Sequence, residues 1–321
     1  MLLLAGDIGG TKSWLRAVDS EAPEKILAEA KYPSQTFDSL ESIIQQFSQT
    51  FQFSHFESAC FGLPGPVSGR QADLTNLPWH IDADHLQQQC SIDQVELIND
   101  FQAAAFGIDG LNPSQYVVLH PGEYDGRGNR LVVGAGTGLG IAPIVRCMDG
   151  FWPQPCEGGH MDFAPVNQTQ QALLSWFWQV WPHVSYERIL SGAGLEALYA
   201  FFAGLDPHDH QAWFSAEQVY SFAEQGQQHA VSALDAFVEI YGSYIGNVAL
   251  LWPSRAGVYI AGGIAGKIKA WMEKSSFLYN LHNKGRMQKL VMSMPIYLVT
   301  DPALGLTGAM FRARRLFKPC Q

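Results

Sequence analysis

Two glycine-rich turns, each set between short apolar segments, constrain the fold of this chain more than any other feature. The first turn is Gly6-Asp7-Ile8-Gly9-Gly10-Thr11, and the second runs from Gly134 to Gly140 with four glycines in seven residues. Both contain a Gly-Thr step, Gly10-Thr11 and Gly136-Thr137, and both are flanked by apolar residues typical of strands. This echo predicts two α/β lobes, each of which contributes one hairpin to a shared cleft.

Both turns have the composition of a phosphate-binding backbone. Glycines allow a ligand to approach the main chain closely, and successive N–H groups can then surround an anion. The first turn lacks the GxxxxGK[ST] pattern of a P-loop, and no helix follows it as in a dinucleotide-binding turn. A plain β-hairpin is the alternative for the first turn, whereas the glycines of the second exceed what a simple turn needs. Asp7, a carboxylate among glycines, predicts a divalent cation reached through its water shell.

A third feature is the segment Leu97-Ile98-Asn99-Asp100-Phe101, where an apolar strand gives way to the start of a helix. An aspartate at such a junction can cap the helix. It can also point into a cleft as a general base, and the two phosphate-binding turns favour this second interpretation. A base together with a phosphate site is the minimal equipment of a kinase, so Asp100 is the expected catalytic residue.

Carboxylates and an imidazole follow in the middle of the chain. Glu157 and His160 flank a Gly-Gly pair, and Glu187 lies in Ser185-Tyr186-Glu187-Arg188. Groups of this kind bind sugar hydroxyls through paired hydrogen bonds. A structural histidine is the alternative for His160. Cys156 nearby is not expected to complete a zinc site, because the five cysteines include no CxxC pair.

Composition narrows the classes of partner. A length of 321 residues predicts two domains, and the net charge of −10 argues against a nucleic-acid partner, which would require a basic face. No stretch supplies the ~20 uncharged apolar residues of a membrane-spanning helix. The N-terminus carries no basic region and reaches Asp7 too early for a signal peptide, so a cytoplasmic location is expected.

Apolar periodicity predicts an α/β protein with a mixed sheet. Strands are expected at 2–5, 14–18, 26–32, 58–61, 95–98, 116–119, 131–134, 139–145, 258–261 and 296–299. Helices are expected at 37–51, 81–90, 102–106, 170–180, 194–202, 216–224, 227–251 and 304–317. We expect a small domain of residues 1–99 plus about 301–321, and a large domain of residues 100–300.

The same segments resemble the bacterial glucokinase family of the actin-like and hexokinase-like ATPase superfamily. The likeness runs in order along nearly the whole chain, and its motifs are modest singly but highly specific together. The matching blocks are Gly6–Thr11, Leu97–Phe101, Gly134–Gly140, Glu157–Pro165, Glu187–Leu195 and Ala261–Ile264. The resemblance implies two lobes of the actin-like, ribonuclease H-like ATPase fold with a cleft between them. It also implies ATP-dependent phosphorylation of glucose at the 6-hydroxyl, with Mg²⁺ as cofactor.

The resemblance implies a role for each matching position. Asp100 is the expected base, and the expected sugar ligands are Asn99, Asp100, Glu157, His160 and Glu187. The residues expected to bind phosphate are Gly6, Asp7, Ile8, Gly9, Gly10, Thr11, Gly134, Gly136, Thr137 and Gly138, with Gly262 and Gly263 near the adenosine. Lys12 stands where many members carry Asn, and we expect it to point to solvent. The zinc motif and the DNA-binding helix-turn-helix of the related repressor/kinase group are missing, which favours the zinc-free enzyme branch.

Several alternatives stay open at this point. The substrate can be another hexose or an N-acetylhexosamine, and the phosphate donor can be ATP, ADP or polyphosphate. A sugar sensor without catalysis and an actin-like filament or chaperone ATPase are further alternatives, although the last leaves Glu157, His160 and Glu187 without a role. Family members are commonly dimers, so a homodimer is expected. Four aromatic residues fit either its interface or a core: Trp176, Phe177, Trp178 and Trp181.

Overall fold

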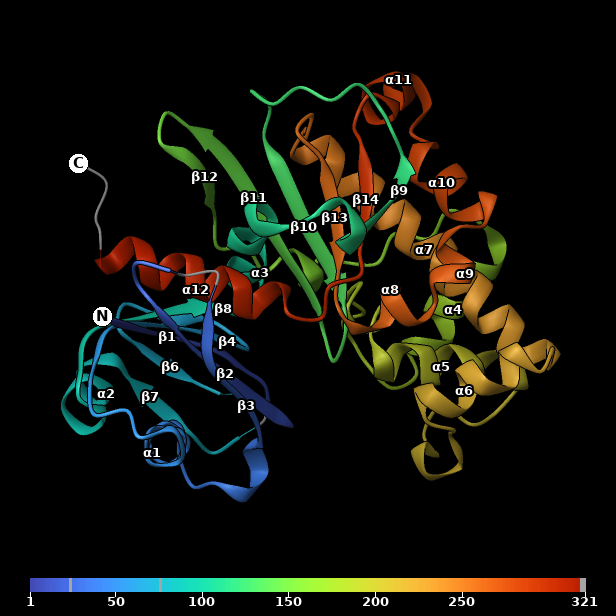
Figure 1. The fold of residues 1–321 in the computed structure, drawn as a ribbon. Coiled ribbons are helices and arrows are strands. Elements are labelled where there is room, and N and C mark those ends of the chain that lie inside the picture. The colour runs from blue at the N-terminus through green and yellow to red at the C-terminus, as the bar shows by residue number, and fades with distance from the viewer. Residues whose placement is uncertain (23–24, 75–76, 318–321) are drawn as a thin grey trace. The chain divides into compact units, whose positions relative to one another are not determined.

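The structure, a computed structural model, describes residues 1–22, 25–74 and 77–317. The chain divides into two compact units, Met1–Asn112 with Asp301–Gln321, and Pro113–Thr300 (Figure 1). The expected large domain began at residue 100, whereas the structure assigns residues 100–112 to the first unit. The reason is that helix α3 (Asp100–Gly107) packs closely along helix α12 (Leu304–Phe317), which belongs to that unit.

A five-stranded mixed sheet forms the centre of the first unit. Its strands, in spatial order, are β3 (Ile26–Pro33), β2 (Lys12–Asp19), β1 (Leu2–Ile8), β4 (Phe56–Leu63) and β8 (Ile92–Asn99). β1 pairs antiparallel with β2 across the first glycine turn, and β1, β4 and β8 run parallel to one another. The carboxyl ends of these three strands therefore meet at one edge of the sheet, where ligands bind in open α/β sheets.

Helices cover both faces of this sheet. α1 (Leu40–Phe51) and α2 (Ala83–Cys90) pack on the face that carries Leu4 and Ile8, while α12 packs on the face that carries Asp7. The apolar positions of α1 recur at helical spacing and are fully buried: Leu40, Ile43, Ile44 and Phe47. α2 begins at Ala83 because the Asp82 carboxylate accepts the N–H groups of Asp84 and His85 and so caps the helix.

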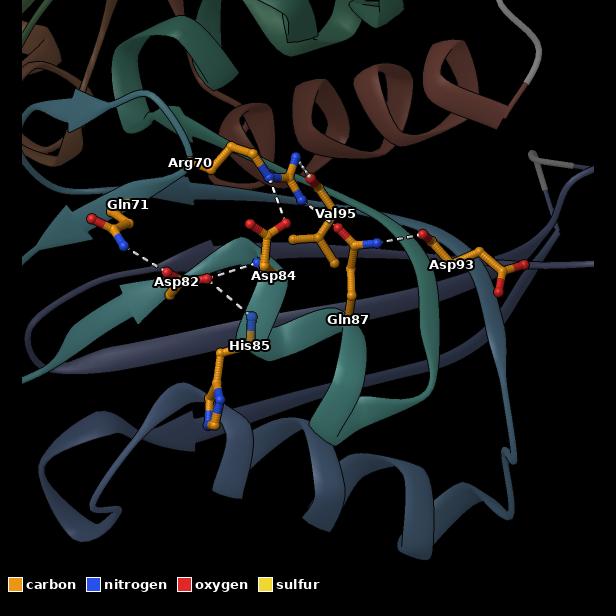
Figure 2. Close-up of polar contacts among 8 residues, drawn as sticks. All are labelled: Arg70, Gln71, Asp82, Asp84, His85, Gln87, Asp93 and Val95. Carbon is orange, nitrogen blue, oxygen red and sulfur yellow. Dashed lines mark hydrogen bonds and ion pairs between the residues drawn. The ribbon is translucent and has the colours of Figure 1, made fainter.

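A small three-stranded sheet, which the sequence pattern did not predict, follows β4. Its strands are β5 (Val67–Ser68), β6 (Gln71–Asp73) and β7 (His80–Asp82). Figure 2 shows how polar contacts attach it to its neighbours: Arg70 donates to Asp84 on α2 at 2.8 Å and to the Val95 carbonyl on β8 at 3.2 Å. Gln71 donates to Asp82 at 2.6 Å, so the same carboxylate that caps α2 also binds β6. The turn between β5 and β6 is thereby held against α2 and β8.

The second unit repeats the plan of the first. Its six-stranded sheet has the order β12 (Gly150–Pro153), β11 (Leu139–Cys147), β10 (Arg130–Ala135), β13 (Val258–Ala261), β14 (Ile296–Val299) and β9 (Tyr116–His120). β10 pairs antiparallel with β11 across the second glycine turn, and β10, β13 and β14 run parallel. This pairing matches that of β1, β2, β4 and β8, so the expected duplication of the two halves is confirmed. β9 adds an antiparallel strand at the far edge.

Helices of the second unit pack around one apolar core. They are α4 (Gln168–Phe177), α5 (Gly192–Ala203), α6 (Ala216–Glu224), α7 (Gln228–Leu251), α8 (Gly263–Lys267), α9 (Lys269–Met272), α10 (Ser275–His282) and α11 (Gln288–Met292). The predicted apolar face of α7 is buried in this core, with Leu234, Phe237, Tyr241 and Ile245 fully enclosed. Short 3₁₀ helices lie at Ser34–Thr36, Ile108–Gly110, Pro113–Gln115, Gly158–His160, His210–Ala212 and Gly285–Met287. Across the described ranges, no helix has both the length and the apolar character needed to cross a membrane.

The aromatic group around α4 divides between core and surface. Phe177 is fully buried, and Trp181 packs on it with ring centroids 5.4 Å apart. Trp176 is partly buried and stacks on Trp213 at 5.7 Å. Trp178 alone of the four is exposed. Three of these residues therefore stabilise the second unit itself.

The contact between α3 and α12 depends on glycine. A Cβ added at Gly308 would lie 1.8 Å from the carbonyl oxygen of Ala103, which is far inside van der Waals contact. We predict that Gly308→Ala lowers the free energy of unfolding by about 1–3 kcal/mol, because the two helices must separate. Gly266→Ala on α8 is the matched control, since nothing lies within 4 Å of its added methyl group. Thermal and urea unfolding of both variants measure the difference, and equal stabilities would contradict the prediction.

Candidate active site

Asn99, rather than Asp100, is the cap of α3. The Asn99 side-chain oxygen accepts the Phe101 N–H at 2.9 Å, and the Gln102 side chain accepts the Asn99 N–H at 3.1 Å, which completes a capping box. The Asn99 side-chain N–H donates to the Gly65 carbonyl at 3.1 Å. Asp100 Oδ1 shares the Phe101 N–H at 2.9 Å. Because Asn99 provides the cap, the helix does not require a carboxylate at position 100.

Strand register brings Asp7 to the same sheet edge as Asp100. Asp7 on β1 lies opposite Gly62 on β4, and Gly62 lies opposite Ile98 on β8, two residues before Asp100. One strand intervenes, so the main chains at Asp7 and at the end of β8 are roughly 10 Å apart. Gly62 is required here because a Cβ would lie 2.9 Å from Cβ of Ala103 in α3. The close contact allows α3 to begin directly above β4.

The Asp7 carboxylate occupies an enclosed position beneath the start of α12. A Cβ added at Gly305 would lie 3.4 Å from it, so the absence of a side chain there leaves it room. Burial raises the pKa of Asp7, and the positive charge of Lys12 opposes that shift. Among residues 1–22, 25–74 and 77–317, no group makes a hydrogen bond to this carboxylate. Asp7 is therefore able to accept an external cation or its bound water.

The first glycine turn is shorter than the sequence motif. Gly6, Asp7 and Ile8 lie within β1, and the turn itself is closed by the Gly9 N–H, which donates to the Lys12 carbonyl at 2.9 Å. The N–H groups of Gly10 and Thr11 have no hydrogen-bond acceptor in the described part of the chain. Two adjacent N–H groups at a turn tip suit an anion.

The second glycine turn has the same character. Gly134 lies in β10, and the turn comprises Gly136, Thr137 and Gly138, with the Gly136 N–H donating to the Gly138 carbonyl at 2.8 Å. The N–H groups of Thr137 and Gly138 have no acceptor among the residues that the structure describes. The Gly192 N–H, at the start of α5, donates to the Gly136 carbonyl at 2.9 Å. This bond places the N-terminus of a twelve-residue helix beside the turn, where its dipole favours an anion.

Glu187 lies directly behind the second turn. Its Oε2 accepts the Leu139 N–H at 2.9 Å, and its Oε1 lies 3.8 Å from Nε2 of His160. The second distance is too long for a direct hydrogen bond, so both groups can still bond to a ligand, and a hydroxyl group placed to one side of the pair can contact both. The structure thus brings together two predicted sugar ligands from segments 27 residues apart.

Glu157 precedes a 3₁₀ turn, Gly158–His160, and His160 ends it, with the His160 N–H donating to the Glu157 carbonyl at 3.0 Å. Gly159 within this turn admits no side chain, because a Cβ would lie 2.0 Å from the Leu139 carbonyl. The Glu187 N–H donates to the Gly159 carbonyl at 3.0 Å. These contacts hold Glu157, His160 and Glu187 on one scaffold with β11, and both Glu157 and His160 are exposed.

A pocket of about 590 Å³ opens beside the second turn, entirely within the second unit. It contains the predicted residues Gly136, Thr137 and Gly263. Gly262 has φ +86°, a conformation suited to glycine, and turns β13 into α8. The volume is in the range of pockets that hold nucleotides and other small ligands.

Most of the pocket lining was not predicted from the sequence. The additional residues are Gly192, Ala193, Leu195, Glu196, Ala216, Glu217, Tyr220, Ile264, Lys267 and Ile268. Four of them lie in the matching blocks, three in Glu187–Leu195 and one, Ile264, in Ala261–Ile264, but the sequence assigned these positions no role. The others come from α6, from the N-terminal half of α5 and from the end of α8, where the sequence reads as ordinary helix and gives no sign of a binding surface.

Solved structures establish the class of protein. A glucokinase from an Antarctic psychrotroph superimposes with a TM-score of 0.85 at 31% identity, covering 98% of this chain and 99% of that one. A ROK family glucokinase from Streptomyces griseus, solved with glucose and AMPPNP, has a TM-score of 0.63 at 20% identity, covering 98% and 100%. The predicted α/β fold of two actin-like lobes is confirmed. Fold and site together define a sugar kinase of the actin-like ATPase fold.

The particular family follows from sequence comparison. A family model described as Glucokinase matches residues 4–316. The glucokinase of Nostoc sp. is 38% identical over 98% of this chain and 99% of its own length. The chain belongs to the glucokinase family, and it is an enzyme that phosphorylates a sugar.

The contact between Gly138 and Glu187 yields a direct test of the site. A Cβ at Gly138 would lie 2.5 Å from Glu187 Oε2, so Gly138→Ala must displace the end of that flexible side chain. We expect the melting temperature to stay close to wild type while the KM for the sugar rises about tenfold, the effect of losing a hydrogen bond to a charged group. Gly136→Ala adds the same methyl group with nothing within 4 Å, and it should leave the KM for the sugar near wild type. An unchanged KM for the sugar in Gly138→Ala would exclude Glu187 from the sugar site.

Proposed function

We propose that the chain is an ATP-dependent glucokinase that transfers the γ-phosphoryl group to the 6-hydroxyl of glucose, giving glucose 6-phosphate and ADP. The capping box of α3 carries this proposal, because Asn99 provides the helix cap and Asp100 stands beside it at the carboxyl ends of β1, β4 and β8. The Streptomyces griseus relative binds glucose and an ATP analogue, which supports the same pair of substrates here.

In this mechanism Asp100 is the general base. Its carboxylate accepts the proton of the 6-hydroxyl while that oxygen attacks the γ-phosphorus of ATP. The bond from the γ-phosphorus to the β–γ bridging oxygen breaks, and ADP leaves with the electron pair. Such transfers pass through a loose transition state, so positioning and electrostatic stabilisation dominate catalysis. Positioning of two reactants can lower a barrier by ~7–11 kcal/mol.

The remaining hydroxyls are held by Asn99, Glu157, His160 and Glu187. The 3.8 Å separation between Glu187 Oε1 and His160 Nε2 supports this assignment, since one hydroxyl can donate to the carboxylate and accept from the imidazole. The Asn99 amide already bonds to Gly65 and Phe101, which holds it in one orientation before the sugar arrives. A ligand set that is rigid before binding loses less entropy on association.

The nucleotide and its metal use the glycine turns and the pocket. The N–H groups of Gly10, Thr11, Thr137 and Gly138 bind phosphate oxygens, and the adenosine occupies the pocket that Gly263 lines. Mg²⁺ commonly uses one or two carboxylates together with phosphates and water, and the enclosed Asp7 carboxylate fits that requirement. When bound, the metal neutralises phosphate charge as it develops.

Replacement of the base tests the mechanism. We expect Asp100→Asn to keep the affinity for glucose and to lower kcat by about 10²–10⁴-fold, the contribution of a positioned base. A coupled assay for ADP measures kcat, and equilibrium dialysis measures glucose binding. Asp38→Asn, at an exposed position before α1, is the control and should behave like wild type. Turnover near the wild-type level in Asp100→Asn would falsify the assignment.

The same assay distinguishes the substrates. A panel of glucose, mannose, fructose and N-acetylated hexosamines, each with ATP, ADP or polyphosphate, ranks kcat/KM directly. Glucose with ATP should give the highest value. A higher value for another sugar or donor would reassign the substrate while leaving the role of Asp100 in place.

We also propose that the enzyme is a homodimer, as expected from its resemblance to the family, and that it works in the cytoplasm. Sedimentation equilibrium at micromolar concentration should give twice the 35.4 kDa mass of one chain. A mass of one chain at that concentration would overturn the proposal of a homodimer. Cell fractionation of the native organism tests the cytoplasmic location.

A further inference from the structure

Two lysines of the first unit converge on one tryptophan beside the first glycine turn. The ammonium of Lys31 lies 3.7 Å from the centroid of the Trp14 ring, and that of Lys12 lies 5.3 Å from the same centroid. Trp14 is buried, with 6% of its surface exposed, while both lysines are exposed. Lys12 is exposed, as expected, and its ammonium group also lies over the same aromatic ring as that of Lys31.

Strand register explains the arrangement. Trp14 on β2 lies opposite Lys31 on β3 and opposite Asp7 on β1, and directly opposed residues project from the same face of a sheet. Lys12 is two residues before Trp14, so it shares that face. Lys12 and Lys31 therefore lie on the same face of the sheet as Asp7.

The end of β3 is also attached to the turn itself. The Ser34 N–H donates to the Thr11 carbonyl at 3.0 Å, and the Ser34 hydroxyl donates to the Gly9 carbonyl at 2.7 Å. Ser34 is buried and also contacts Ser13 Oγ at 2.9 Å. The segment that carries Lys31 is thus held beside the turn.

Within the described residues neither ammonium group forms a close ion pair, although the charge of Lys12 acts on Asp7 at longer range. Within the described ranges, no carboxylate oxygen lies within 4.0 Å of Lys12 or Lys31 Nζ. The nearby Glu29 is already engaged, because it accepts from Arg16 Nε at 2.7 Å and from Trp14 Nε1 at 3.0 Å. Two like charges held together repel each other, and an anion bound between them would relieve that repulsion.

We propose that Lys12 and Lys31 bind the terminal phosphates of the nucleotide, as a cationic extension of the first glycine turn. This rests on the proposed function, because it assumes that the turn receives a polyphosphate chain. Lys12 follows directly after the N–H groups of Gly10 and Thr11, so one phosphate can contact both the backbone and the ammonium. In a chain of net charge −10, two local cations also reduce the repulsion that an incoming nucleotide meets.

The test uses binding of inorganic tripolyphosphate without metal, measured by calorimetry, alongside ATP kinetics. Lys12→Met and Lys31→Met remove the charge and keep an apolar stem over Trp14. Each should weaken tripolyphosphate binding about tenfold, the effect of losing one hydrogen bond to a charged group, and should raise the KM for ATP in parallel. Lys25→Met, before the opposite end of β3, makes the same change in net charge and should match wild type.

Further outcomes separate this inference from a structural role and from the proposed function. The defect of each variant should shrink as salt rises, because screening weakens exposed charges, and Lys31→Arg should restore binding. If wild type uses ATP but Lys12→Met and Lys31→Met bind tripolyphosphate normally, this inference alone is wrong. Failure of wild-type protein to bind tripolyphosphate also overturns it. If wild type phosphorylates glucose from tripolyphosphate with no nucleotide present, the proposed function fails instead.

Discussion

Parallel pairing of β1, β4 and β8 is the constraint on which the catalytic half of the site depends. It brings the end of a hairpin strand and the end of a crossover strand to one sheet edge, and so places Asp7 and Asp100 there. The arrangement requires α3 to begin immediately after β8, and this is possible because Gly62 presents no side chain to Ala103. The position of Asp100 is thus set by how strands β4 and β8 and helix α3 pack together.

The two units use one scaffold for different electrostatic purposes. In the first, Lys12 directly follows the turn, Lys31 shares the Trp14 ring with it, and Asp7 lies just before the turn. In the second, the turn is backed by Glu187, which is paired with His160. The duplicated strand order supplies exposed N–H groups twice, and the flanking side chains then give each copy its own ligand preference.

Much of the architecture was predictable because long periodic segments dominate it. α6, α12, β13 and β14 have the expected bounds, and both glycine turns lie where the sequence placed them. The small sheet β5–β7 escaped prediction because strands of two or three residues carry no periodicity. The partnership of Glu187 with Leu139 and His160 also escaped, since spacing along a chain does not reveal which loops meet. Asn99 as cap, with Asp100 beside it, required the hydrogen-bond geometry.

Asn99 shows how folding and recognition can share a single functional group. Its amide oxygen begins α3 and its amide nitrogen bonds to Gly65, so both ends of the side chain are committed to the protein. Aspartate would preserve the cap but would oppose a carboxylate to the Gly65 carbonyl, and leucine would lose both bonds. Selection on helix stability therefore narrows the choices at this position independently of any sugar. Sequence invariance at residue 99 across relatives would, for that reason, be poor evidence of substrate contact taken alone.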